Sequence, residues 1–397
     1  MNEANNQQPL RVLMINLPFS GHTNPTLGLA GELVKRGCQV AYIQAPQWKD
    51  RVLSTGAAFI PYDNYDEALS PGKKEFKSWS GAYNTALRVG GDFDCIIYEI
   101  LFFPGKNLAD KLKKPSIRLF STFALNRRVI DDFGRTGGLY MTAVFRLKPL
   151  LRLLSSRLYK KYRLAYKDIV DELVLNGPEL NFIYTLREFQ IYNTDFPDSN
   201  YHFIGPSITA RPTEIEIPFE NIKNPLIYIS LGTLINHSIS FFRKCFKAFG
   251  KEEVTVILSI GKSIKKEDLG PIPPNFYVYP FVPQLEVLKH AALFITHGGM
   301  NSVNESLYFG VPMLVIPVGN DQPTVANRVE ELGLGKRINN REATPEMLRK
   351  AAFSVLSDPG CKEELRKFRD LMRNSGGNAL AADETIKYLN NSRQGPK

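Results

Sequence analysis

Short apolar runs alternate with longer amphipathic stretches along most of the chain. In the first half, runs rich in β-branched and aromatic residues predict strands at Arg11–Leu17, Gln39–Gln44, Cys95–Tyr98 and Ser116–Phe120. In the second half, the corresponding runs are Pro225–Ser230, Val254–Ser259, Phe276–Tyr279, Leu293–Thr296 and Met313–Ile316. Strands that alternate with helical patterns are typical of βαβ units, so the pattern predicts an α/β protein with parallel sheets.

A proline-rich stretch separates the two halves and cannot hold a helix. A break at Gly376–Gly377 sets off a last helix, which we expect to pack back toward the first domain. The expected architecture is two doubly wound, Rossmann-like domains that face each other across a cleft, with ligands at the carboxyl ends of the strands. The expected bounds are 9–205 for the N-terminal domain, 206–224 for the linker, 225–375 for the C-terminal domain and 376–391 for the last helix.

The composition excludes several classes of protein. With 43% hydrophobic and 23% charged residues among 397, the chain is typical of a globular protein. No apolar run approaches the roughly 18 residues that span a bilayer, and no signal peptide is recognisable, so we expect a cytoplasmic protein. The four cysteines are too widely spaced for a metal site. A net charge of +10 suits several anionic partners, but no nucleic-acid-binding motif is present and we expect no such partner.

A glycine pair follows the predicted strand Leu293–Thr296 and opens a helical pattern. The sequence over 297–302 is His-Gly-Gly-Met-Asn-Ser, in which the glycines let the backbone approach a ligand while the helix start directs N–H groups and a positive dipole end at it. Asn301 and Ser302 add donors, and Glu305, one turn on, can accept from paired hydroxyls such as those of a ribose. The alternative is a strand-turn-helix unit whose glycines serve tight packing alone.

Further loops that follow predicted strands meet at the same sheet edge. They contain Gly232 with Thr233, Val282 with Gln284, and Asp321 with Gln322. A carboxylate next to an amide is suited to holding sugar hydroxyls. The chain has neither a Gly-x-Gly-x-x-Gly fingerprint after its strands nor a P-loop, which argues against dinucleotide redox chemistry and ATP hydrolysis. A nucleotide that carries a sugar fits these loops better.

A histidine occupies the corresponding place in the first half. His22 follows the first predicted strand and precedes a helix whose start is marked by Pro25 and whose end is marked by Gly37. The positive end of the helix dipole favours the neutral imidazole, which can accept a proton. Glu99 follows a strand of the same sheet, so its carboxylate can fix the imidazole tautomer. The alternative is a histidine with a structural role alone, the role that we give to His202, His237 and His290.

Taken together, these motifs carry a resemblance that covers nearly the whole chain. They read Gly-His-Thr-Asn-Pro over 21–25, Phe-Ile-Gly-Pro over 203–206, Val-Pro-Gln over 282–284, His-Gly-Gly-Met-Asn-Ser over 297–302, Gly-Val-Pro over 310–312, Asp-Gln over 321–322 and Asn-Arg over 327–328. The set resembles the UDP-glycosyltransferases, and is similar to the bacterial macrolide-type branch that glycosylates antibiotics, flavonoids and other small hydrophobic acceptors. The resemblance implies a GT-B fold with acceptor binding in the N-terminal domain. It also implies inverting transfer from a UDP-sugar, commonly UDP-glucose, without a metal or other cofactor.

The resemblance also implies a role for each matching residue. His22 is the base that deprotonates the acceptor hydroxyl, and Glu99 is its partner, at a position where the family usually has the shorter aspartate. The implied donor contacts are Val282 and Gln284 at uracil, Glu305 at the ribose, Asp321 and Gln322 at the sugar, and His297, Ser302 and Thr233 at the diphosphate, with Gly232, Gly299 and Asn301 in the same site. The acceptor oxygen attacks the anomeric carbon opposite UDP, while the helix start at 298–302 stabilises the diphosphate.

Other functions stay open beside this one. The chain can be a GT-B enzyme of another kind, such as a nucleotide-sugar epimerase or a transferase with a lipid or membrane-associated acceptor, or a catalytically silent auxiliary subunit. An intact His22 and donor signature weaken the silent alternative. We expect a monomer whose partners are the UDP-sugar and a small hydrophobic acceptor.

Basic residues gather between Arg146 and Lys167, a segment without an acidic residue. Apolar residues recur there at spacings of three and four, which predicts an amphipathic helix with Pro149 in its first turn. The segment is either a solvated face, a site that attracts an anionic acceptor, or a weak contact with an anionic membrane surface. Candidates for lining the acceptor pocket, each equally a candidate for the core, are Phe102, Phe103, Phe123, Phe133 and Tyr140.

Overall fold

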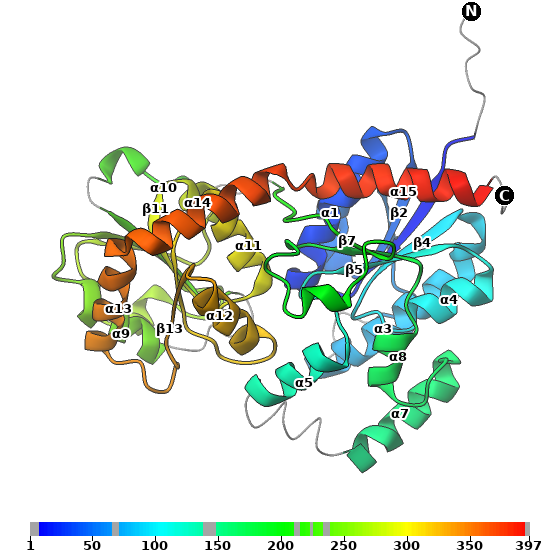
Figure 1. The fold of residues 1–397 in the computed structure, drawn as a ribbon, viewed down its shortest axis with the longest axis horizontal. Helices are drawn as coiled ribbons and strands as arrows, with labels where there is room; N and C mark the ends of the chain where they lie inside the picture. Colours follow the sequence, from blue (N-terminus) through cyan, green and yellow to red (C-terminus); the bar gives the residue numbers. More distant parts are fainter. Residues whose placement is uncertain are drawn as a thin grey trace, which may run out of the picture. The chain divides into compact units, whose positions relative to one another are not determined.

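The computed structural model of the chain describes residues 8–65, 71–137, 148–209, 215–222, 225–232 and 239–393. The chain divides into two compact units (Figure 1). Unit 1 comprises residues 1–130, 144–209 and 375–397, and unit 2 comprises 131–143 and 210–374. The division after residue 209 therefore falls within the predicted linker, whereas residues 131–137 group with unit 2 and not with the stretch 9–205.

Unit 1 is built on a sheet of seven parallel strands within the described residues. From edge to edge, the strands are β3 (Ala58–Pro61), β2 (Gln39–Gln44), β1 (Arg11–Ile15), β4 (Cys95–Glu99), β5 (Ser116–Phe120), β6 (Leu180–Ile183) and β7 (Tyr201–Phe203). The central strands are buried along almost their whole length, as expected for a parallel sheet with both faces covered. The order reverses between β1 and β4, so this pair forms the switch point at which ligands bind in doubly wound sheets.

Helices connect these strands and cover the sheet. The described helices that begin in unit 1 are α1 (Ser20–Lys35), α2 (Lys49–Leu53), α3 (Pro71–Val89), α4 (Gly105–Leu112), α5 (Arg127–Thr136), α7 (Lys148–Tyr162), α8 (Ile169–Leu175) and α15 (Gly377–Arg393). The last helix, α15, packs on α1, so unit 1 uses both the first and the last part of the described chain (Figure 1).

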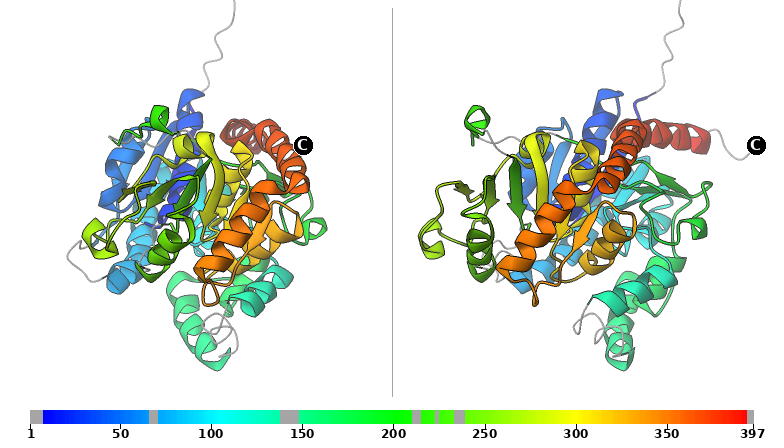
Figure 2. Two further views of the ribbon diagram at one scale, coloured as in Figure 1. Left: turned by 90° about the vertical axis from the view of Figure 1, so that its left-hand side faces the viewer. Right: turned by 60° about the vertical axis from the view of Figure 1, so that its left-hand side comes forward.

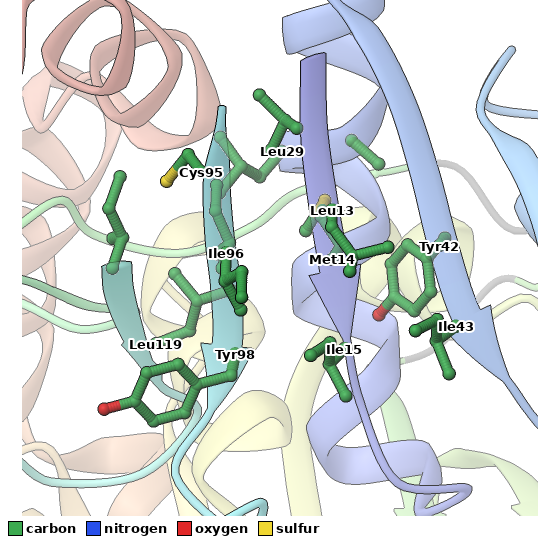
Figure 3. Packing of buried hydrophobic residues seen from close by; sticks show 14 of the residues in the cluster. Leu13, Met14, Ile15, Leu29, Tyr42, Ile43, Cys95, Ile96, Tyr98 and Leu119 are labelled. Atoms are coloured by element: carbon green, nitrogen blue, oxygen red, sulfur yellow. The ribbon is translucent and has the colours of Figure 1, made fainter. Parts of the chain in front are cut away.

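Apolar side chains from neighbouring strands form the core of unit 1. Leu13 and Ile15 on β1 lie between Ile43 on β2 and Ile96 on β4 (Figure 3). Burying an aliphatic side chain of this size contributes about 1.5–3 kcal/mol each before chain entropy is counted. The four cysteines are buried free thiols.

Unit 2 repeats the same plan, with a sheet of six parallel strands in the part of the unit that the structure describes. The strands in order are β10 (Phe276–Tyr279), β9 (Thr255–Ser259), β8 (Leu226–Ser230), β11 (Ala291–Thr296), β12 (Met313–Val315) and β13 (Gly335–Arg337). The described helices are α9 (Ile239–Phe249), α10 (Gln284–His290), α11 (Met300–Phe309), α12 (Gln322–Glu331), α13 (Pro345–Ser357) and α14 (Pro359–Asn374). Helix α13 contacts β11, β12 and β13 and packs on α9, and α14 packs on α11 (Figure 2). Here the strand order reverses between β8 and β11.

The basic segment contains the helix α7, with Pro149 as its second residue. Tyr162 is buried in the core of unit 1, and Leu158 packs against that core. The side chains of Leu147, Leu151 and Leu154 lie outside the described ones. Among the described side chains of the segment, the exposed basic ones are Arg157, Lys160, Lys161, Arg163 and Lys167. Among the described helices, neither α7 nor any other has the length and apolar character of a membrane span.

Candidate functional site

His22 lies in the first turn of α1, at the switch point of the unit 1 sheet. The helix begins at Ser20, two residues before His22, so the prediction that His22 precedes the helix and that Pro25 marks its start is wrong. The backbone N–H groups of His22 and Thr23 donate to the carbonyl of Phe19 and close the first turn before Pro25 is reached. The imidazole is thereby held at the positive end of the helix dipole.

The side chain of His22 contacts the carboxylate of Glu99, the last residue of β4. His22 Nδ1 lies 2.7 Å from Glu99 Oε1, and Glu99 Oε2 accepts a hydrogen bond from the backbone N–H of Leu101 at 2.9 Å. Glu99 is fully buried, whereas the His22 side chain is 26% exposed. Because the carboxylate oxygen accepts from Nδ1–H, the other ring nitrogen, Nε2, carries a lone pair.

The sheet explains why these two residues meet. β1 and β4 pair in parallel with Ile15 opposite Tyr98, so the start of α1 and Glu99 leave the sheet at the same edge. The buried Asn16 fixes the turn between β1 and α1, since its Nδ2 donates a hydrogen bond to the carbonyl of His22 at 2.9 Å. The strand is one residue longer than predicted and ends with Glu99, and this position at the carboxyl end of β4 brings Glu99 beside His22.

A third polar residue, Ser121, lies at this site and was missed in the sequence. Ser121 directly follows β5, and its Oγ lies 2.7 Å from both His22 Nδ1 and Glu99 Oε1. The signal that points to it is the rule applied to His22 and Glu99: residues just past the ends of neighbouring parallel strands share one edge.

Aromatic side chains flank the imidazole. The ring centroids of Phe19 and His22 are 6.3 Å apart, and Trp79 lies 6.3 Å beyond Phe19. The indole N–H of Trp79 donates to the carbonyl of Leu101 at 2.9 Å, which joins this aromatic pair to the segment that holds Glu99. Both aromatic rings are only partly buried.

The aromatic residues proposed for the acceptor pocket differ from one another in burial. Phe102 is fully buried in the core, and Phe123 is fully buried and stacked on Phe189, so these two are packing residues. Phe103 is half-buried against Tyr162, and Phe133 is nearly buried. Tyr140 lies outside the described residues.

In unit 2, the imidazole of His297 fits between two glycines at the β8–β11 switch point. A Cβ atom on Gly232 would lie 2.6 Å from His297 Cε1, and one on Gly299 would lie 2.6 Å from His297 Nε2. His297 Nδ1 is buried and has no hydrogen-bond partner within the described chain. Burial lowers the pKa of His297 to about 4, so the ring is neutral near pH 7.

The helix α11 starts directly behind this histidine. Gly298 adopts a positive φ of 86°, and a Cβ there would lie 2.6 Å from Val315, so both backbone and packing require glycine. No described side chain caps α11, whose N-cap is Gly299. The start of the helix therefore presents backbone N–H groups and a positive dipole end beside a neutral imidazole, which suits an anion.

The predicted nucleoside contacts come together in the structure. Gln284, at the start of α10, donates through Nε2 to Glu305 Oε2 at 2.6 Å and to Ser302 Oγ at 3.3 Å. Its Oε1 accepts from the hydroxyl of Tyr228 at 3.1 Å, and Tyr228 stacks on Phe294. Tyr228 is a second polar contact that the sequence did not suggest.

The remaining predicted residues vary in accessibility. Val282 is only 1% exposed, and Gln284 and Asn301 are half-buried. Gln322 is buried and its Oε1 accepts from the backbone N–H groups of residues 318 and 319, which leaves its amide N–H₂ for other partners. Asp321 is half-buried at the N-cap of α12. Thr233 lies outside the described residues.

Comparison with known proteins identifies relatives over the whole length. Residues 141–376 match the family described as UDP-glucoronosyl and UDP-glucosyl transferase. The chain is 33% identical over 403 residues to the uncharacterized UDP-glucosyltransferase YojK of Bacillus subtilis (strain 168), covering 96% of this chain and 98% of that protein. It is 30% identical to demethyllactenocin mycarosyltransferase of Streptomyces fradiae, covering 92% and 84% of the two chains. Among solved structures, the glycotransferase of kitacinnamycin superposes with a TM-score of 0.81 at 29% identity, covering 96% of this chain and 100% of that one.

Proposed function

The chain belongs to the UDP-glucoronosyl and UDP-glucosyl transferase family and is a GT-B glycosyltransferase, and from this premise we propose its reaction in detail. It transfers glucose from UDP-glucose to a hydroxyl group of a small hydrophobic natural product. The transfer inverts the anomeric carbon and uses no divalent metal ion.

The observation that carries this proposal is the 2.7 Å contact between His22 Nδ1 and Glu99 Oε1. This contact directs the lone pair of His22 Nε2 away from the carboxylate, so that Nε2 can take the proton of an acceptor hydroxyl. As the proton moves, Glu99 stabilises the imidazolium that forms. A base that activates the acceptor for direct attack supports a single displacement, and a single displacement inverts the anomeric centre.

The departing UDP needs charge stabilisation of its own. The start of α11 supplies backbone N–H groups and a dipole end, and His297 adds a neutral imidazole beside them. These groups supply the electrostatic role that a divalent metal plays in other transferases, which supports the metal-independent mechanism. Glu305 is suited to the ribose hydroxyls, because a carboxylate accepts from both.

Two observations support a hydrophobic acceptor. Phe19 and Trp79 flank His22 with partly exposed rings. The relative named demethyllactenocin mycarosyltransferase is 30% identical over nearly the whole chain, and its name gives a natural product as the acceptor. An apolar wall beside the base fits such an acceptor, since it binds the scaffold while the hydroxyl reaches Nε2.

The test replaces the base and compares it with a histidine of the same unit. His22→Ala is expected to bind UDP normally and to lose transfer to an alcohol acceptor by about 10²–10⁴-fold, the usual contribution of a general base. The matched control is His202→Ala, because His202 lies on β7, away from the His22–Glu99 pair, and packs edge-to-face on Phe182. Product stereochemistry is read from the anomeric coupling constant. Near-full activity of His22→Ala, or a product that retains configuration, would contradict the proposal.

A further inference from the structure

We propose that Ser121 is a positioning residue that holds the imidazole of His22 in its reactive orientation, an inference that rests on the proposed role of His22 as the base. The three polar atoms form a closed triangle, with His22 Nδ1, Glu99 Oε1 and Ser121 Oγ each 2.7 Å from the other two. Each atom therefore has both others within hydrogen-bond distance.

The hydrogen-bond directions within the triangle follow from the chemistry of the three groups. Glu99 is an acceptor, so the Ser121 hydroxyl donates to Oε1. The lone pairs of Ser121 Oγ are then available to Nδ1–H of His22, which is shared between the serine oxygen and the carboxylate oxygen. A rotation of the ring that weakens one contact weakens the other, so two anchors resist it.

The longer side chain of glutamate explains why a serine is useful at this position. Glutamate has one more rotatable bond than the aspartate that is usual at this position in similar enzymes. Fixing its carboxylate in one orientation therefore costs more conformational entropy. The Ser121 hydroxyl fixes Oε1, and the N–H of Leu101 fixes Oε2. With both oxygens held, the longer side chain presents a single orientation to His22.

The position of Ser121 is itself well determined. β4 and β5 pair in parallel with Glu99 opposite Leu119, so Ser121, the first residue after β5, leaves the sheet at the same edge as Glu99. The following loop is held by the buried Gln190, which accepts from the N–H of Ala124 at 2.9 Å and donates to its carbonyl at 3.3 Å. Ser121 is only 4% exposed, in keeping with a group that acts through its neighbours.

The test measures transfer from UDP-glucose to three acceptors of increasing acidity: an alcohol, a phenol and a thiophenol. Ser121→Ala is expected to lower kcat for the alcohol by roughly 10- to 100-fold, the usual effect of losing a hydrogen bond to a charged or catalytic group. The loss shrinks as the acceptor becomes more acidic, because an acceptor that ionises readily depends less on the base. The KM for UDP-glucose stays unchanged, and Ser121→Thr, which keeps the hydroxyl, restores most of the rate.

Two further variants isolate the triangle. In a Glu99→Asp background the shorter carboxylate withdraws from the serine, so adding Ser121→Ala is expected to cost much less than it does in the parent enzyme. The matched control is Ser116→Ala, since Ser116 is equally buried at 4% exposure but lies at the opposite end of β5. If Ser121→Ala fails to fold, Ser121→Cys replaces it, because a thiol is a much weaker donor of similar shape.

The outcomes separate this inference from the proposed function. If Ser121→Ala raises only the KM for UDP-glucose, or lowers kcat equally for all three acceptors, Ser121 contacts the donor or supports the fold and the inference is wrong. If His22→Ala retains activity, the proposed base itself is wrong, whatever Ser121 does. Both the inference and the proposed function are supported if the loss of kcat in Ser121→Ala shrinks as the acceptor becomes more acidic and if the loss in His22→Ala is larger.

Discussion

The side-chain amide of Gln284 donates to the carboxylate of Glu305 across 2.6 Å. The two residues come from different helices, α10 and α11, and Glu305 is only 2% exposed. The amide thus orients one oxygen of the carboxylate that we propose for the ribose.

Removing the carboxylate is expected to weaken UDP binding. Glu305→Ala loses the acceptor for the ribose hydroxyls and leaves the Gln284 amide without its partner, so the dissociation constant rises by about tenfold or more. Calorimetry with UDP and with 2′-deoxy-UDP checks the cause, because the parent protein prefers UDP and the variant loses that preference. Glu286→Ala, at an exposed carboxylate of α10 paired with Lys289, is the matched control. An unchanged affinity for UDP would remove Glu305 from the site.

Donor binding is expected to be independent of divalent metal ions. The groups proposed for the diphosphate are backbone N–H groups of α11 and the neutral His297, and neither needs a cation to hold an anion. UDP should raise the melting temperature equally with EDTA and with added Mg²⁺, and transfer rates should agree as well. Loss of both UDP binding and turnover in EDTA would contradict this mechanism.

Stability is expected to fall on acidification because of His297. Its pKa is lowered from 6.5 to about 4 in the folded chain, so between these values the unfolded chain binds a proton that the folded chain does not. The free energy of unfolding therefore decreases as the pH falls through this window, by roughly 3 kcal/mol at most from this group. Urea titrations at about pH 7.5 and about pH 5 should show a smaller decrease for His297→Gln than for the parent. Equal decreases would mean that His297 titrates normally.

A methyl group at Gly299 is expected to displace the imidazole of His297. The new Cβ would lie 2.6 Å from Nε2, a distance that the backbone or the ring must relieve by moving. Gly299→Ala should lower the free energy of unfolding by about 1–3 kcal/mol and weaken UDP binding. Gly91→Ala is the matched control, since nothing lies within 4 Å of a Cβ there. If the two variants bind UDP alike, the glycine does not serve the histidine.

The basic face of α7 and the residues after it are expected to bind anionic vesicles weakly. Lys160, Lys161 and Arg163 are exposed, and exposed charges are screened beyond about 8 Å at 0.15 M salt. Sedimentation with anionic vesicles should be seen at low salt and abolished at high salt. Replacing these three residues with Gln should remove it, whereas the same change at Lys262, Lys265 and Lys266, exposed in unit 2, should not. Unchanged binding at low salt in the first triple variant would leave this face an ordinary solvated one.

The central strands could be predicted from the sequence because they are buried on both sides. Gln39–Gln44 and Ser116–Phe120 have the bounds expected from their apolar runs. The edge strand Phe276–Tyr279 also has its expected bounds, although its residues alternate between buried and half-buried. The strands that were missed are short and mostly near sheet edges. β13 is Gly-Lys-Arg and half-buried, and β7 is Tyr-His-Phe, so pairing with a neighbour defines them and no local periodicity does.

The candidate site also has features that could be predicted from the sequence and features that could not. Position at the end of a strand placed Glu99 beside His22, and it would have placed Ser121 there too had the rule been applied to every strand. The start of α1 was predicted five residues late, because Pro25 is favourable in a first turn and Ser20–Gly21 has no strong helix signal. The contact between Gln284 and Glu305 could not be predicted from the sequence, because it depends on how the helices α10 and α11 pack.

The place of α15 has a consequence for synthesis on the ribosome. Ala381, Ala382 and Leu389 belong to the core of unit 1, and Gly28 of α1 leaves room for Asn378. The strands of unit 1 leave the ribosome first, yet the helix that covers α1 follows only after the sheet of unit 2 has been made. A nascent chain halted before residue 377 therefore carries an uncovered apolar surface on α1, so unit 1 begins to be translated before unit 2 and is completed after it.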